Sequence, residues 1–581
     1  MQLITPSTYI NAGWDFHSIW SFSETTQNAT SYGSKPTPVL LAMNPMGTWT
    51  GDFSTDWNAA GNWVNWIIPD TLVDITIPAG RSYYPVIDSG TTVKAYKISV
   101  NNGATFKIST GGAMTISDSL VNNGTFTLAS SASGNGSLIV DTAVSGTGNF
   151  IRQQYIPNND GWHMIASPSL SDTIIGSDFV PAPSGGILGT DFDFYSFNEA
   201  VSASWDNIRA TGNTVNTGFE KEFDPGKGYL VAYAASYGKT MLNFKGKFNV
   251  GDVTTPNLTV TSADTWAGWN LIGNPYTSAI DWNKANKSAF ADNFAYVYDP
   301  NKAGGAGYVT VDGTTSGALI APGQGFFVDV NTPGSFTFTH SMQIHHTSSV
   351  LKTDAVSNDV TLRLSSGSNK YDETTVRIVS GSDTKRDRTD ALQMNSLDKS
   401  VPQLWSYTSD SVAVSINSYP VIDSVQKVQM GVYIPSDGSY SISLQKQTGD
   451  FGNEQVILED LSNGTKTNLS QSGNYTFNAS KGDSKQFILF VTGTMGINNP
   501  TANNTTLLYA YQSRVFIQNK DNSPITGQVK IYNLLGQVVY QKQVSETSRV
   551  VLNPNVTTGI YIVRLQDNKG NVLTKKVSIS E

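Results

Sequence analysis

Two short stretches of this chain, VNNGATFKI at 100–108 and VNNGTFTL at 121–128, repeat one pattern. In each, an Asn-Asn-Gly turn precedes a run of alternating apolar and polar residues, the period of a strand with one buried face. The copies start about twenty residues apart, a spacing typical of β-solenoid rungs. Because a rung buries its apolar side chains only by stacking on the next, the pattern predicts a β-solenoid-like module over residues 49–155. An ordinary meander of hairpins is the alternative.

The composition favours β-structure along the whole chain of 581 residues. There are 52 glycines and charged residues make up only 14%, which suits many short strands joined by tight turns. The chain is also too long for a single hydrophobic core. We therefore predict an all-β, multidomain protein.

Charge and cysteine content disfavour several classes of function. The net charge is −9 and no stripe of Lys and Arg is present, so nothing attracts a phosphate backbone and we expect no nucleic-acid partner. The chain has no cysteine, which excludes disulfides, a thiol nucleophile and a Cys-ligated metal. No run of about eighteen apolar residues occurs, so we expect no transmembrane segment.

Three sequence landmarks occur twice, in the same order, between residues 156 and 348. The pairs are GWHMI 161–165 with GWNLI 268–272, FYSFN 194–198 with AYVYD 295–299, and DPGKGYLV 224–231 with APGQGFFV 321–328. The order predicts two copies of one β unit, at 156–255 and 256–348, packed side by side. Pro sets the first dihedral of a turn and Gly accepts positive φ, so we expect a structural role for Pro-Gly-x-Gly.

Regularly spaced alternating runs return after the duplication and predict a β-sandwich over residues 349–494. The stretch GINNPTANNT at 496–505 has almost no apolar residues and predicts a linker over 495–506. If the protein is processed, we expect the cut in this linker.

The last segment, residues 507–581, combines VKIYNLLG at 529–536, GIYIVRL at 559–565 and KKVSI at 575–579. Alternation alone predicts a small antiparallel β-sandwich. The ordered combination resembles the type A C-terminal sorting domain of the type IX secretion system of Bacteroidota. The resemblance implies an Ig-like sandwich that directs a protein to the outer-membrane surface or the medium. It also implies two partners, the translocon and its sorting protease.

The residues that carry this resemblance are the ones we expect to act as the sorting signal. They are Gly536, Gly559, Tyr561, Lys575, Lys576 and Val577. Formation of the strands and turns is their simpler role, because a translocon reads a folded shape.

The beginning of the chain differs from a secretory signal. Residues 1–8 lack both a basic region and an apolar core, and the motif AGWDF at 12–16 resembles the closing rung of repetitive surface β-helices. We therefore expect the chain to be the C-terminal piece of a longer protein, with residues 1–48 ending an upstream β-repeat region.

Few residues carry recognisable chemistry, and we predict no catalytic residue and no resident metal. His345 and His346 are adjacent, so on a strand they point to opposite faces and cannot share one ion. Asp191 and Asp193 would share a face, as a glycosidase pair requires, but Asp-x-Asp is more often part of a turn.

A weak calcium site is the one cofactor that the sequence leaves open. Asp292 and the run Asp299-Pro-Asn301 offer oxygen ligands of the kind that suits Ca²⁺. The alternative is that these residues form Asx-turns.

Tryptophans near the beginning of the chain suggest a glycan-binding platform. Asp56-Trp57-Asn58 and Asn62-Trp63 place indole rings beside groups that can bond sugar hydroxyls. The simpler alternative is that the rings pack in a core.

Three functions remain open from the sequence. We favour a non-catalytic exported surface protein, adhesin-like or structural, delivered by its C-terminal signal. The alternatives are the auxiliary C-terminal region of a secreted hydrolase and a carbohydrate-binding module, for which surface glycans are the candidate partner.

Overall fold

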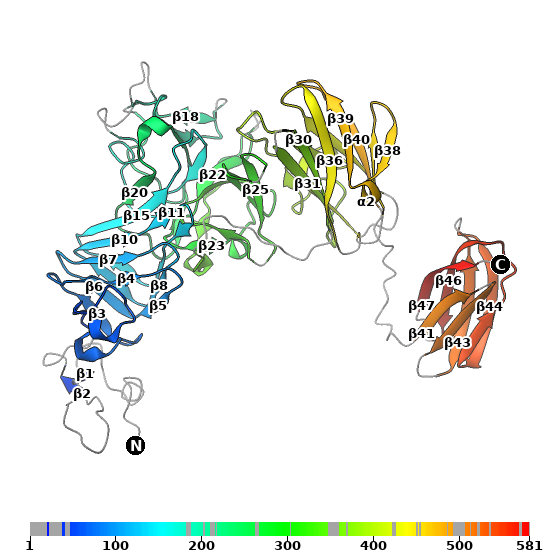
Figure 1. Ribbon diagram of the computed structural model, residues 1–581, viewed down its shortest axis with the longest axis horizontal. Helices are drawn as coiled ribbons and strands as arrows, with labels where there is room; N and C mark the ends of the chain where they lie inside the picture. Colours follow the sequence, from blue (N-terminus) through cyan, green and yellow to red (C-terminus); the bar gives the residue numbers. More distant parts are fainter. Residues whose placement is uncertain are drawn as a thin grey trace. The chain divides into compact units, whose positions relative to one another are not determined.

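The computed structural model is all-β, which confirms the predicted fold class (Figure 1). Contacts divide the chain into two compact units, and the second contains residues 491–581. The structure describes residues 20–22, 38–40, 47–181, 187–201, 204–209, 215–216, 218–261, 266–302, 304–315, 317–346, 359–367, 370–420, 426–448, 451, 455–484, 486–491, 506–511, 513–519, 523–533, 536–568 and 572–579.

The predicted β-solenoid is confirmed over residues 74–152 (Figure 1). Its strands stack in parallel, whereas a meander of hairpins would pair them antiparallel. One sheet contains β3 (Asp74–Ile77), β6 (Lys97–Val100), β9 (Ser119–Asn122) and β14 (Ala143–Ser145); a second contains β4 (Val86–Ile87), β7 (Thr105–Ile108), β10 (Thr125–Leu128) and β15 (Asn149–Tyr155); a third contains β5 (Thr92–Ala95), β8 (Ala113–Ile116) and β13 (Ser137–Val140).

The repeated sequence motif sets the register of the rungs. Phe126 pairs with Phe106 on one side and with Phe150 on the other. The rings of Phe106 and Phe126 stack with centroids 4.9 Å apart, and alternate residues of β7 and β10 are buried. Burial of equivalent side chains in successive rungs is therefore what holds the solenoid together.

Shorter elements flank the rungs. They are β1 (Trp20–Phe22) paired with β2 (Pro38–Leu40), the 3₁₀ turns η1 (Ala60–Asn62) and η2 (Val64–Trp66), and the lateral hairpin of β11 (Ser130–Ser131) and β12 (Gly134–Asn135). The motif AGWDF at 12–16 lies outside the described residues.

The two copies of the duplicated unit have the same strand order. The first sheet runs β16 (His163–Ile165), β19 (Tyr229–Tyr233), β17 (Phe192–Phe197), β18 (Trp205–Asn207), and the second runs β22 (Trp269–Gly273), β27 (Gly325–Asp329), β24 (Phe294–Asp299), β25 (Gly307–Asp312). In both, the first landmark strand pairs with the third, and the third pairs with the second. The duplication inferred from the landmarks is thus a duplication of topology.

The remaining elements of this region connect the copies with their surroundings. β20 (Met241–Lys245) of the first copy pairs antiparallel with β15, so the solenoid sheet continues into the duplicated unit. The others are η4 (Ala235–Tyr237), β21 (Val253–Thr254) with β28 (Thr337–Phe338), β23 (Ala279–Asp281) with β26 (Leu319–Ile320) and β29 (Gln343–Ile344), η5 (Trp282–Lys284) and η6 (His340–Met342).

The two copies contact each other reciprocally, through the Pro-Gly-x-Gly turn of one and the first landmark strand of the other. Ala166 N donates to Gly323 O at 2.9 Å, and the equivalent Gly273 N donates to Gly226 O at 2.9 Å. Single bridges join Ile165 to Gln324 and, equivalently, Ile272 to Lys227. Matching residues exchange matching contacts, which is the signature of a local two-fold relation.

Close approach explains the glycines in this contact. A Cβ on Gly273 would lie 2.3 Å from the Cβ of Ala166, and a Cβ on Gly228 would lie 2.6 Å from Ile272 O. Aromatic rings fill the space beside the turns, including Phe197 and Phe327 with centroids 4.8 Å apart. The pair of copies is therefore one packed body with a shared core.

Residues 359–491 form a large mixed sheet in place of two separable sheets. Its order is β38-β37-β40-β35-β33-β34-β31-β30-β36-β39, with β32 on β34. The strands are β30 (Asp359–Ser366), β31 (Tyr371–Ile378), β32 (Ala391–Leu392), β33 (Gln403–Tyr407), β34 (Ala413–Tyr419), β35 (Gln426–Tyr433), β36 (Gly438–Gln447), β37 (Val456–Asp460), β38 (Thr465–Asn468), β39 (Asn474–Ala479) and β40 (Gln486–Val491), with one short helix, α2 (Leu469–Ser472). The strands β39 and β40 lie near opposite ends of this order, yet the ring centroids of Phe477 on β39 and Phe487 on β40 are 5.3 Å apart. The sheet therefore folds over a core as in a sandwich.

Arginines of the large sheet and of its loop anchor the second copy. Arg377 Nη1 lies 2.6 Å from Asp312 Oδ2, and Arg386 Nη2 lies 2.5 Å from Asp329 Oδ2. Arg386 also lies 3.7 Å from the buried Asp292. Because these charges are largely shielded from water, removal of one partner would leave an uncompensated charge.

The C-terminal unit contains the two antiparallel sheets predicted for residues 507–581. One consists of β41 (Thr506–Tyr511), β42 (Arg514–Asn519) and β45 (Arg549–Leu552); the other of β44 (Val538–Thr547), β43 (Ile525–Tyr532), β46 (Gly559–Asp567) and β47 (Val572–Ile579). A core that includes Val529, Val563 and Ile579 lies between them. Residues 495–505 of the predicted linker lie outside the described part of the chain.

We expect Gly273→Ala to lower the free energy of unfolding by about 1–3 kcal/mol, because the added methyl group overlaps Ala166 in a buried contact. Gly367→Ala is the matched control, since a Cβ there meets nothing within 4 Å, and it should change stability by less than about 0.5 kcal/mol. Urea unfolding of both variants measures the difference. Equal stability of the two would contradict the close approach of the copies.

Candidate binding cavity

The tryptophans proposed as a glycan platform are core residues. Trp57 and Trp63 are 2% and 1% exposed, and their ring centroids lie 4.8 Å apart in a T-shaped arrangement. Trp63 also meets Trp49 edge-on at 5.0 Å, and Trp57 packs against Phe106 of the solenoid. Neither indole face is open to a sugar, so these residues cap the solenoid core instead of forming the expected platform.

The polar neighbours of these rings hold the local chain together. The buried Asn62 accepts hydrogen bonds from Phe53 N at 3.0 Å and Ser54 N at 2.7 Å, and its Nδ2 donates to Asp56 O at 2.8 Å. Asp56 Oδ1 accepts from Asn58 N at 2.8 Å, as in an Asx-turn. Asp56, Asn58 and Asn62 therefore stabilise the loop that carries the tryptophans.

The oxygen ligands considered for Ca²⁺ do not converge. Asp292 lies just before the start of β24 and Asp299 at its end, about 20 Å apart by the rise of an extended strand. Asp292 accepts from Phe294 N and Tyr296 Oη at 2.9 and 2.7 Å, and Asp299 Oδ1 accepts from Asn301 N at 2.8 Å. The Asx alternative accounts for Asp299, and burial raises the pKa of Asp292 to about 7.

Other candidate residues serve the scaffold. His345 bonds Thr115 Oγ1 and Ser137 Oγ of the solenoid, each at 2.8 Å, and Asp191 accepts from Ile187 N at 2.6 Å. Within the described ranges, no group of three or more His, Asp or Glu side chains is arranged to hold a metal ion. No described helix is long and apolar enough to cross a membrane.

The six residues expected to act as the sorting signal lie on β46, β47 and the turn between β43 and β44. Gly536 has φ +79°, which the turn requires. Tyr561 Oη donates to Thr557 O at 2.8 Å, a bond that fixes the entry to β46. Val577 is buried, whereas Gly536, Lys575 and Lys576 are exposed.

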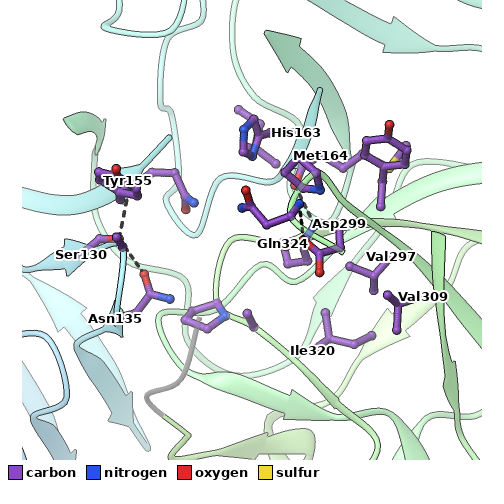
Figure 2. A pocket seen from close by; sticks show the side chains of 18 of the residues that line it. Ser130, Asn135, Tyr155, His163, Met164, Val297, Asp299, Val309, Ile320 and Gln324 are labelled. Atoms are coloured by element: carbon purple, nitrogen blue, oxygen red, sulfur yellow. Dashed lines mark hydrogen bonds between the residues drawn. The ribbon is translucent and has the colours of Figure 1, made fainter. Parts of the chain in front are cut away.

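A cavity of about 500 Å³ lies where the solenoid and both copies of the duplicated unit meet (Figure 2). The β11–β12 hairpin and the end of β15 supply Ser130, Asn135, Gln154 and Tyr155. The first copy supplies His163–Ile165, and the second supplies Val297, Asp299, Val309, Ile320 and Gln324. The volume falls within the range of small-ligand sites.

A buried arginine fixes the orientation of two amides on the solenoid side. Arg152 is 1% exposed; its Nη2 donates to Asn135 Oδ1 at 3.1 Å and to Pro322 O at 2.8 Å, and its Nη1 donates to Gln154 Oε1. Because a guanidinium only donates hydrogen bonds, it selects the amide oxygens. The NH₂ groups of Asn135 and Gln154 are therefore left as donors at the cavity.

The opposite side carries acceptors (Figure 2). Gln324 Nε2 donates to Met164 O at 2.9 Å and to Gly325 O at 2.8 Å, so its Oε1 remains an acceptor. Among the described residues, the buried His163 Nε2 has no hydrogen-bond partner. Burial lowers the pKa of His163 to about 4, so the ring is neutral at pH 7 and has one donor and one acceptor nitrogen.

Three of the duplicated landmarks line this cavity, and their sequence pattern did not predict it. GWHMI 161–165, AYVYD 295–299 and APGQGFFV 321–328 were landmarks of the duplication. The available signal was the exchange of residue types between the copies, such as His163 in the place of Asn270.

Comparison with known families finds two matches. Residues 48–490 match the family described as a domain of unknown function (DUF8693), and residues 499–580 match the secretion system C-terminal sorting domain. The second match confirms the resemblance to a type IX sorting domain, which indicates secretion to the cell surface or medium.

A distant relative is the minor fimbrium subunit Mfa5 of Porphyromonas gingivalis, 23% identical over 390 residues. The aligned region covers 61% of this chain and 31% of the relative, so the chain spans about a third of the relative's length.

Solved structures show only weak overall similarity. PorZ, a surface component of the type IX secretion system of Porphyromonas gingivalis, is 14% identical, with 29% of this chain and 24% of that chain covered and a TM-score of 0.12. The BSP domain of a biofilm-associated protein is 8% identical, with 74% and 92% covered and a TM-score of 0.12.

We expect Trp63→Ala to destabilise the protein by about 3–5 kcal/mol, since it removes a buried ring from the solenoid cap. Trp66→Ala is the control, because Trp66 is 75% exposed, and it should cost less than about 0.5 kcal/mol. Urea unfolding followed by far-UV circular dichroism distinguishes the two. A small effect of Trp63→Ala would restore the glycan platform as an interpretation.

His163 should make stability depend on pH. Its folded-state pKa is about 4, below the usual 6.5, so the unfolded chain takes up this proton first as the pH falls. The contribution of His163 to the free energy of unfolding is therefore fully present above about pH 6.5 and is lost as the pH falls from about 6.5 to about 4. His163→Asn should reduce the loss by about 1–2 kcal/mol at pH 5, measured by urea unfolding at pH 5 and 7.5. An unchanged pH dependence would show that His163 is accessible to water.

Proposed function

This chain belongs to the family described as a domain of unknown function (DUF8693), and on that premise we propose that it is a non-catalytic surface protein with a structural or adhesive role. The sorting domain at residues 499–580 indicates that the chain is a secreted cargo of the type IX system. That match is the observation that carries the proposal, because it places the other residues outside the cell.

The architecture of residues 48–490 supports a role in contact. Parallel rungs, reciprocal packing of the copies and buried arginine–carboxylate pairs join the solenoid, the copies and the large sheet into one compact unit. A rigid β-body presents its side chains at defined positions without paying for ordering on binding. The distant similarity to a fimbrial subunit also supports a structural or adhesive role.

We propose that the translocon reads the C-terminal sandwich and that the sorting protease cuts before β41. The exposed Lys575 and Lys576 on β47 are the side chains that we assign to recognition, with Gly536, Gly559, Tyr561 and Val577 maintaining the shape. Cleavage in the linker predicted over 495–506 would remove the sandwich as a unit.

Deletion of residues 572–581 removes β47, which pairs with β46 along its whole length and contributes the buried Val577 and Ile579 to the core. We expect the truncated protein to remain in the periplasm. Cell fractionation and protease accessibility of intact cells measure this.

A reporter domain fused to residues 499–581 is the control for cargo folding. It should reach the surface with the full sandwich and should fail to do so without residues 572–581. Surface display of the truncated fusion would contradict the sorting role of β47.

Attachment of cells that lack the protein, measured on abiotic and glycan-coated surfaces, tests the adhesive role. Turnover of a substrate by the purified chain would contradict a non-catalytic role.

A further inference from the structure

The duplication provides an internal comparison for the cavity. Strand register and landmark order show which residues occupy equivalent positions in the two copies. His163 is equivalent to Asn270, Gln324 to Lys227, and Val309 to Asp206. The second member of each pair lines a smaller pocket of about 170 Å³, which we name the counterpart pocket. One pair of β units has therefore produced two sites at equivalent places.

In the counterpart pocket, Asn270 and Lys227 are bonded within the protein, whereas the buried Glu199 Oε2 has no hydrogen-bond partner among the described residues. Asn270 Oδ1 accepts from Thr259 N at 3.1 Å, and its Nδ2 donates to Thr259 O and Gly268 O at 2.9 and 3.1 Å. Lys227 forms an ion pair with Glu220. In the cavity, Gln324 Oε1 is left as an acceptor, and the ring of His163 belongs to the lining although its Nε2 is buried.

At three equivalent positions the cavity has an apolar residue where its counterpart has a charged or polar one. Asp206 is replaced by Val309, Ser196 by Val297, and Glu199 by Pro300. Val297 and Val309 are half-buried and form an apolar wall with Ile320 (Figure 2). One carboxylate remains, Asp299, which stands where the other copy has Asn198. The cavity is larger than the counterpart pocket, about 500 Å³ against about 170 Å³, and these differences in residue type make most of its lining uncharged.

The polar groups of the cavity are held in fixed directions. The hydrogen bonds from Arg152 direct the NH₂ groups of Asn135 and Gln154 into the cavity. Two backbone carbonyls bind the NH₂ group of Gln324 and so direct its Oε1 into the cavity. Donors and acceptors are thus prepared on two sides of an apolar wall before any ligand arrives, which lowers the cost of binding. Arg152 itself is 1% exposed, so a ligand in the cavity meets the amides that Arg152 orients instead of the guanidinium.

We propose that the cavity binds the uncharged end of an oligosaccharide, one or two neutral sugar rings deep. A sugar hydroxyl both donates and accepts, which matches the amide groups directed into the cavity and the carboxylate of Asp299, while the ring of His163 adds contact area to the lining. The C–H face of a sugar ring is apolar and suits Val297 and Val309. The inference rests on the proposed adhesive function and names the chemistry of its ligand.

The test uses the purified full chain on an array of neutral and acidic oligosaccharides, with titration calorimetry on the best neutral binder. Val309→Trp fills the cavity and should weaken binding at least tenfold. Asp206→Trp is the matched control, because Asp206 is exposed and holds the equivalent position in the counterpart pocket, and it should leave the affinity unchanged.

A second variant tests the proposal without a change of volume in the apolar wall. His163→Asn installs the residue of the counterpart pocket and should also weaken binding, with circular dichroism showing an intact fold. The absence of neutral-glycan binding, a preference for acidic glycans, or equal loss in Val309→Trp and Asp206→Trp would each overturn the proposal. Surface delivery and cell attachment are measured separately, so a failure here is distinguishable from a failure of the proposed function.

Discussion

The reciprocal contact between the two Pro-Gly-x-Gly turns and the two landmark strands is the constraint on which residues 156–346 depend. It brings Gly273 and Ala166 so close that only a glycine fits at one side, and it fixes Gln324 beside Ile165. The cavity exists because this contact sets the first strand of one copy against the turn of the other, next to the solenoid hairpin. Rigid backbone contacts of this kind position side chains more accurately than free loops do.

The two copies of the duplicated unit share the residues that pack and differ in the residues that line their pockets. Both copies keep the glycines of the Pro-Gly-x-Gly turn, the aromatic rings and the strand order, because packing requires them in both places. The residues that line the two pockets differ. Asn270 is fully bonded within the protein, whereas Gln324 Oε1 is left as an acceptor at the cavity. Each pocket also has one buried unpaired atom, Glu199 Oε2 in one and His163 Nε2 in the other, among the described residues, which costs free energy in both.

Local pattern predicted much of the fold and little of the cavity. The Asn-Asn-Gly repeats indicated stacked rungs, and the structure pairs the same phenylalanines in register. The tryptophans before Asp70 were a different case, because an amphipathic aromatic residue can cap a core or face water and only the surrounding chain decides. Trp57 and Trp63 are buried, while Trp66, three residues further along, is exposed.

The sequence by itself determined the all-β class, the solenoid rungs, the duplicated topology and the C-terminal sorting sandwich, since each depends on residues that are near in sequence or recur with a fixed order. Only the tertiary structure decided that Asp292 and Asp299 lie apart and that the buried Asn62 holds its loop by hydrogen bonds. It also decided that Asn135, His163 and Gln324 line one cavity. The physical reason is distance along the chain. Such groups converge through packing and hydrogen bonds between separate elements, and no local periodicity records that convergence.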